Sequence, residues 1–150
     1  MNFVSLLGSE LKSDSIIELL ELWESEVVYD FDRMHENSPD KYWAAAESEG
    51  VRFRFDENQI LVCIFLYVLD WEGFSSIDLN ATDVPAIRSP GEVFSYANQY
   101  GVGVSNGEGE LFGVVREWVR LKWDGYSIHY EFREGVLSLV TLSSVQDCKL

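Results

Sequence analysis

Hydrophobic and polar residues alternate in two stretches of the chain that lie 77 positions apart. The first, VRFRFDENQILVCIFLYV (51–68), alternates valine and phenylalanine with arginine before a polar turn and an almost continuous apolar run. The second, IHYEFREGVLSLVTLSSV (128–145), follows the same order. Because successive side chains of a strand point to opposite faces, each stretch predicts an antiparallel hairpin with one buried face.

Apolar residues at helical spacing precede each hairpin. Residues 13–28 carry the longest such stripe and predict the clearest helix. Residues 40–49 predict a short second helix, and residues 90–100 a third, which Ser89-Pro90 opens and Gly101 closes. The two longer helices therefore stand at the same distance from their hairpins.

The remaining segments predict strands and loops. Residues 74–88 give an ambiguous pattern that fits one edge strand at most, and residues 101–113, with five glycines, predict a mobile loop. Strands are expected over roughly 115–123, 126–132 and 136–143, joined by glycine-containing turns.

These elements predict one α+β domain over residues 1–150. We expect an antiparallel sheet of about five to six strands with helices packed on one face. The shared spacing of 77 also indicates a pseudo-duplicated helix–hairpin unit, with repeats at about 13–69 and 90–145. Inhibitor-type scaffolds built from helix–sheet repeats look similar, although such a likeness concerns only the fold.

Charge narrows the classes of partner. The 150 residues hold 26 acidic residues against 11 Lys and Arg, a net charge of −15, and the first 50 residues are the most acidic. Such a chain repels the phosphate backbone, so we expect no nucleic-acid partner, whereas a basic protein would be attracted. The longest apolar run, 60–69, is too short for a membrane span, and the two cysteines resemble thiols of a cytoplasmic protein.

No arrangement of residues predicts catalysis, a metal site or a cofactor. The only histidines are His35 and His129, and no serine lies in a Gly-x-Ser-x-Gly turn. Carboxylates near Asp30 and Glu36 could gather around a cation, but acidic residues fall this way often in an acidic protein. The glycines of 101–107 follow a predicted helix, where a dinucleotide-binding motif would follow a strand. We therefore expect a protein that is not an enzyme.

Three segments resemble a family of small bacterial cytosolic proteins: FLYV with GF (65–68, 73–74), SPGEVFSYANQYG (89–101) and WVRLKWDGYSIHYEFREGVLSLVTL (118–142). Members of that family resemble immunity proteins encoded beside polymorphic or contact-dependent growth inhibition toxins. Val102 stands where the family has proline, and Val119 and Lys122 replace two acidic residues. If those acids bind the partner in relatives, this chain must bind elsewhere, and its acidic first 50 residues are the obvious candidate.

Together, charge and resemblance predict an immunity-type protein that binds and neutralises a cognate toxin domain, expected to be a basic nuclease. Two alternatives stay open: a small-ligand or metal-dependent enzyme that uses the carboxylates near Asp30 and the glycine-rich segment, and an acidic secretion or assembly chaperone. The oligomeric state is not indicated by the sequence. The candidate partner-binding residues are acidic: Glu18, Glu21, Glu24, Glu26, Asp30, Asp32, Asp70, Glu72, Glu108 and Glu110.

Overall fold

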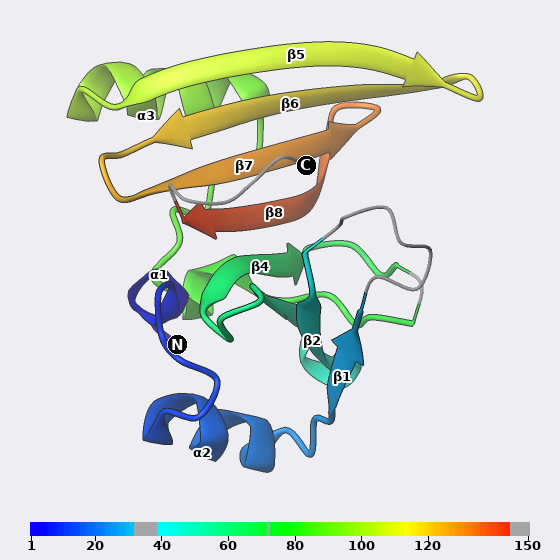
Figure 1. Cartoon of the computed structure of the whole chain (residues 1–150). Helices are drawn as coiled ribbons and strands as arrows, with labels where there is room; N and C mark the ends of the chain where they lie inside the picture. The colour runs from blue at the N-terminus through cyan, green and yellow to red at the C-terminus, as the bar shows by residue number, and fades with distance from the viewer. Residues whose placement is uncertain (32–38, 72, 145–150) are drawn as a thin grey trace.

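In a computed structural model, one antiparallel sheet of eight strands organises the described part of the chain, residues 1–31, 39–71 and 73–144 (Figure 1). Its strand order is β1-β2-β3-β4-β8-β7-β6-β5, so β1 and β5 form the two edges. The strands are β1 (Val27–Asp30), β2 (Lys41–Ala46), β3 (Val51–Phe55), β4 (Leu61–Tyr67), β5 (Gly103–Leu111), β6 (Val114–Lys122), β7 (Tyr126–Arg133) and β8 (Val136–Ser144).

Helices are few and short in the described residues. They are α1 (Phe3–Leu6), α2 (Asp14–Leu22) and α3 (Pro90–Tyr100), with single 3-10 turns η1 (Glu47–Glu49) and η2 (Leu79–Ala81). None of them combines the length and the apolar character that a membrane crossing needs. The Ser89 hydroxyl accepts a hydrogen bond from the Glu92 amide at the start of α3, and Gly101 ends that helix with a φ of 64°.

The predicted fold, a sheet of five to six strands with helices packed on one face, is wrong. The sheet has eight strands, and strands β1, β2 and β5 occupy segments for which a helix or a loop was expected. The correction makes this an open sheet that dominates the molecule, with short helices contributing to its core.

Two corrections concern segments that favour other structures locally. Residues 41–46 form a strand despite three alanines because β1 and β3 pair with them on both sides, and Ala44 and Ala46 are buried. Residues 103–111 form an edge strand instead of a mobile loop.

The predicted helix 13–28 ends at Leu22, and Glu24 has a φ of 52° that no helix continues through. Residues 74–88 form no long strand; they contain η2 and turns.

Alternation along the strands separates a core face from an open face. Phe53 and Phe55 of β3 are buried together with Ile64 of β4, Tyr130 of β7 and Val140 of β8. Side chains from the helices and from residues 79–87 complete this core: Phe3, Ile16, Leu20, Leu79, Val84, Ile87, Val93 and Ala97. The opposite face carries the alternate members of the same strands, among them Arg52, Phe65 and Leu139.

The chain passes through the same order of elements twice. A helix and four strands (α2, β1–β4) precede a second helix and four strands (α3, β5–β8), and the two groups join where β4 pairs with β8. The predicted repeats at about 13–69 and 90–145 each contain one group. That the two arose by duplication stays a prediction.

Candidate binding surface on the open face of the sheet

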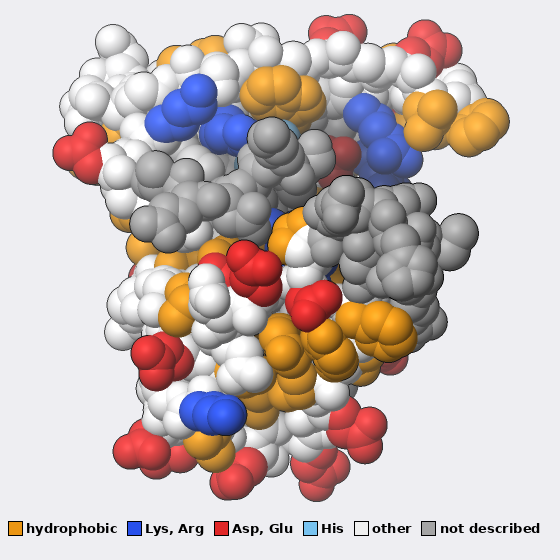
Figure 2. Space-filling view, in the orientation of Figure 1, with side chains coloured by type: hydrophobic (Ala, Val, Ile, Leu, Met, Phe, Trp, Pro, Cys, Tyr) orange, Lys and Arg blue, Asp and Glu red, His pale blue; other side chains and the backbone are white. Residues whose placement is uncertain are grey.

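The open face gathers most of the arginines of this acidic protein. Five of its seven arginines lie there: Arg52 and Arg54 on β3, Arg116 and Arg120 on β6, and Arg133 on β7. Arg52, Arg54 and Arg120 lie between buried residues of their strands, and Arg133 follows the buried Phe132. Because side chains alternate along a strand, these arginines point away from the core, and Arg116, four positions before Arg120, lies on the same side. Figure 2 shows basic side chains over β6 and β7, while most acidic side chains lie toward α2 and the outer edges.

Tryptophan rings hold two of the arginines in place. The Arg52 guanidinium lies 3.8 Å from the ring centre of Trp43, and the Arg133 guanidinium lies 3.6 Å from that of Trp71. A cation packed on an indole face is attracted by the ring quadrupole. The packing fixes the plane of the guanidinium while its edge, which carries the N–H donors, can still meet an acceptor.

A second arrangement joins β5, β6 and β7. The Trp118 ring stacks on His129 with centroids 5.2 Å apart, and Arg120 Nη2 donates to His129 Nδ1 at 3.3 Å. Burial, reinforced by the nearby Arg120 charge, lowers the pKa of His129 to about 4. The imidazole is therefore neutral at pH 7 and serves as an acceptor that positions Arg120. Gly107 of β5 leaves the room that the Trp118 ring occupies.

Two cavities adjoin on this face. The larger, about 520 Å³, is lined by Arg52, Trp71 and Arg133, and the smaller, about 390 Å³, by Trp118, Arg120 and His129. Both are also lined by Phe65 and Leu139, so the two cavities adjoin at these side chains. We call the two adjoining cavities together the arginine groove, which crosses strands β3, β4, β8, β7 and β6.

Several donors in this region are shielded from solvent without an acceptor among the described residues. They are the Nε atoms of Arg116, Arg120 and Arg133. Arg116 faces Glu131 of the neighbouring strand β7, with Nη1 4.0 Å from Glu131 Oε1, a long ion pair. Asp70 lines the larger cavity and accepts a hydrogen bond from the Ser76 amide. Arginine charge therefore exceeds carboxylate charge in the groove.

The predicted acidic residues do not form a single patch. Glu18, Glu21, Glu24, Glu26 and Asp30 are all exposed and follow one another from α2 into the edge strand β1. Glu108 and Glu110 are exposed on β5, at the opposite edge of the sheet.

The remaining three candidates are scattered. Asp70 is the only described candidate that lines the arginine groove. Asp32 and Glu72 lie outside the described residues. Glu36, named with the alternative cation site, also lies outside them, and Asp30 is exposed at the end of β1. Within residues 1–31, 39–71 and 73–144, no three His, Cys, Asp or Glu side chains gather in a way that could hold a metal ion.

Sequence reasoning missed the arginine groove. The alternation of arginine with phenylalanine in residues 51–55 predicts a hairpin with one buried face, but it does not by itself mark the other face as a binding surface. The stronger signal was that arginines at 116, 120 and 133 share that polar side in the second hairpin region. These positions predict arginines on the polar side of each hairpin region, and the pairing of β4 with β8 places both groups on one face of the sheet.

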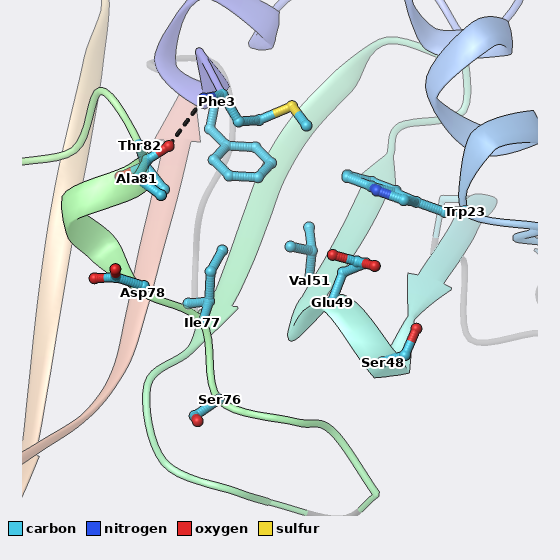
Figure 3. Close-up of a pocket in the computed structure, with 11 residues that line it drawn as sticks. Phe3, Trp23, Ser48, Glu49, Val51, Ser76, Ile77, Asp78, Ala81 and Thr82 are labelled. Atoms are coloured by element: carbon cyan, nitrogen blue, oxygen red, sulfur yellow. Dashed lines mark hydrogen bonds between the residues drawn. The ribbon is translucent and has the colours of Figure 1, made fainter.

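A separate, smaller pocket of about 270 Å³ lies beside α1 (Figure 3). Phe3, Trp23 and Val51 line it, together with the carboxylates of Glu49 and Asp78. The terminal ammonium of Met1 donates to the Ala81 carbonyl at 2.9 Å and thereby joins the start of the chain to this wall. The residues around this pocket hold the N-terminal segment against the sheet.

Comparison of the chain with models of known protein families, with curated protein sequences and with solved structures found no match. The resemblance to immunity-type proteins thus stays a prediction.

Proposed function

We propose that this protein is an immunity-type inhibitor that binds and neutralises a cognate toxin domain through the open face of its sheet, inside the cell that produces both. The observation that carries the proposal is the composition of that face. Tryptophan, tyrosine and arginine dominate binding energy at protein interfaces, and here Trp71, Tyr67, Arg52 and Arg133 line one cavity.

The rigidity of the face supports the same function. Cation–π packing and ring stacking already fix several of its large side chains, so little side-chain entropy is lost when a partner covers them. A sheet of eight paired strands beneath them offers a stiff platform. Preorganised surfaces of this kind suit tight inhibition more than transient contact.

Charge outside the arginine groove indicates the kind of partner. Glu18, Glu21, Glu24, Glu26 and Asp30 make the α2–β1 end strongly negative. A basic toxin domain, such as a nuclease that binds phosphates, would be steered toward this end and would associate faster than a neutral partner. We expect the acidic end to act on the association rate and the open face to act on the dissociation rate.

Protection from the toxin tests the proposal. Each toxin domain encoded beside the gene is expressed alone and together with this protein, and growth and nuclease activity are measured. We expect restored growth, a stable complex and loss of nuclease activity in the purified complex. A Trp118→Ala variant should protect less well, whereas a change at the solvent-exposed Asn98 of α3 should have no effect.

The proposal is wrong if none of these toxin domains is inhibited, or if the purified protein itself turns over a substrate and a single substitution abolishes that turnover. An assembly chaperone would differ in one measurable way: it would bind the toxin segment only while unfolded, and the folded toxin would remain active in its presence.

A further inference from the structure

We propose that the arginine groove binds an extended, carboxylate-rich segment of a partner protein, about six residues long. The inference rests on the proposed function only in taking the partner to be a protein. It assigns a ligand chemistry opposite to the acidic surface considered so far, because the groove is the place where this acidic protein concentrates positive charge.

The charges lining the groove favour an anionic occupant. Arg52, Arg120 and Arg133 line it, against the carboxylates of Asp70 and Glu131. Glu131 is directed to Arg116 at 4.0 Å, and Asp70 already accepts the Ser76 amide. Three lining arginines against two lining carboxylates leave the groove with an excess of positive charge among the described residues.

The arginines of the groove are also partly desolvated. The Nε atoms of Arg120 and Arg133 are shielded from water and have no acceptor among the described side chains. A buried donor without an acceptor is costly, and an ionised carboxylate is the strongest acceptor that a protein partner can deliver. A carboxylate that approaches these guanidinium groups from the groove therefore displaces less water than it would at a fully hydrated arginine.

The shape of the groove selects an extended segment over a small anion. Its two cavities cross five neighbouring strands, which corresponds to about 19 Å at ~4.8 Å per strand spacing. An extended chain covers that length with about six residues at ~3.3 Å each. Because Phe65 and Leu139 separate the two arginine-lined ends, the segment should place carboxylates at its ends and an apolar side chain between them.

Binding of short peptides tests this inference without any toxin. A peptide of alternating glutamate and leucine is compared with matched peptides in which lysine or glutamine replaces glutamate. Binding is followed by titration and by NMR signals of the Trp71 and Trp118 indole N–H groups. We expect submillimolar binding of the glutamate peptide only, weakened by salt, with both indole signals shifting.

Variants locate the site. Arg120→Gln and Arg133→Gln should each weaken binding of the glutamate peptide by about tenfold, the loss of roughly one charge-assisted hydrogen bond. Arg133→Lys keeps the charge but not the paired N–H donors, and it should recover binding only in part. Arg88→Gln is the matched control, because Arg88 is exposed outside the groove and lines neither cavity.

Four outcomes overturn the inference: no binding of the glutamate peptide, equal binding of the glutamine peptide, an equal loss in Arg88→Gln, or full displacement of the peptide by equimolar succinate or phosphate, which would show a small-anion site. Since the wild-type comparison needs no variant, a folding defect cannot hide the answer. Peptide binding without protection from any toxin would leave this inference standing and remove the proposed function.

Discussion

The Trp118 ring lies directly over the α-carbon of Gly107, so a methyl group added to that glycine would lie 2.6 Å from three atoms of the indole. Gly107 and Trp118 are partners in the register of β5 and β6. Gly107 thus shapes the binding surface because it has no side chain. The space that a side chain would fill is occupied by the Trp118 indole.

Replacing Gly107 by alanine should displace the Trp118 ring from its stack on His129. We expect an overpacking cost of about 1–3 kcal/mol in the free energy of unfolding. Partner binding through the arginine groove should weaken as well, because Trp118 lines its smaller cavity. Chemical denaturation and tryptophan fluorescence measure the first effect, and titration with the partner or peptide measures the second.

Gly109→Ala is the matched control for that prediction. Gly109 lies two residues further along β5, on the same face, and an added methyl group there meets nothing within 4 Å. Its free energy of unfolding should change by less than ~0.5 kcal/mol. If the two alanine variants behave alike, the close approach of Trp118 does not decide the structure of this face.

His129 should make the protein less stable as the pH falls from about 6.5 to about 4. The folded state lowers the pKa of this imidazole to about 4 from its usual 6.5, so in that range the unfolded chain takes up a proton that the folded protein excludes. The loss should reach about 2 kcal/mol between pH 7.5 and pH 5. Above the pKa of the unfolded state, about 6.5, the imidazole is neutral in both states, so His129 no longer lowers the free energy of unfolding.

His129→Phe isolates this effect, because phenylalanine keeps a ring for Trp118 to stack on but does not titrate. Denaturation curves of both proteins at several pH values give the difference. The wild type should lose more stability than the variant on acidification, even though carboxylates titrate in both. Parallel pH profiles would mean that folding does not lower the pKa of His129.

The parts of the fold that the sequence predicts are those decided by local chemistry. The hairpin over 51–68 forms as β3 and β4, and the turn at Asp124-Gly125 joins β6 and β7. As expected, Ser89-Pro90 lies at the start of a helix and Gly101 at its end. In each case the turn or cap residues and the apolar period favour the same structure, so no distant contact has to intervene.

The mistaken segments needed information from other strands. Alanines favour a helix over residues 40–49, but pairing with β1 and β3 makes residues 41–46 a strand. Glycines favour a loop over residues 101–113, but Gly107 lies in a strand, where the absence of a side chain leaves space for the Trp118 ring. The arginine groove likewise depends on contacts between strands that are far apart in the sequence. Arg52 and Arg133 are 81 positions apart, and only the pairing of β4 with β8 brings them to one cavity.

Gly50 should tolerate no side chain. Its φ is 71°, and an added methyl group would clash with the Ser75 carbonyl oxygen, a backbone atom that cannot move aside alone. Gly50→Ala should therefore cost well over the ~1 kcal/mol expected from the positive φ alone. Gly101→Ala is the control: it has a similar φ of 64° but open space around it. Thermal unfolding of both variants separates the clash from the strain, and equal losses would show that no clash exists.

Reversing the charges of Glu18, Glu21 and Glu24 to lysine should slow association with a basic toxin domain. Steering acts before contact, so at low salt the association rate should fall by about tenfold while the dissociation rate stays nearly constant. The difference should shrink as salt is added, because screening removes the field in the wild type too. Stopped-flow mixing over a range of ionic strengths measures both rates.

Reversal of Glu108 and Glu110 on β5 is the matched comparison for the reversal at α2. Those residues lie at the opposite edge of the sheet, so the same type of change tests whether position or total charge controls the rate. A larger slowing at α2 means that the toxin approaches from that end before it settles on the open face. Equal slowing per charge at both edges would mean that the field of the whole protein steers the partner, and an unchanged rate in both would exclude the acidic residues from association altogether.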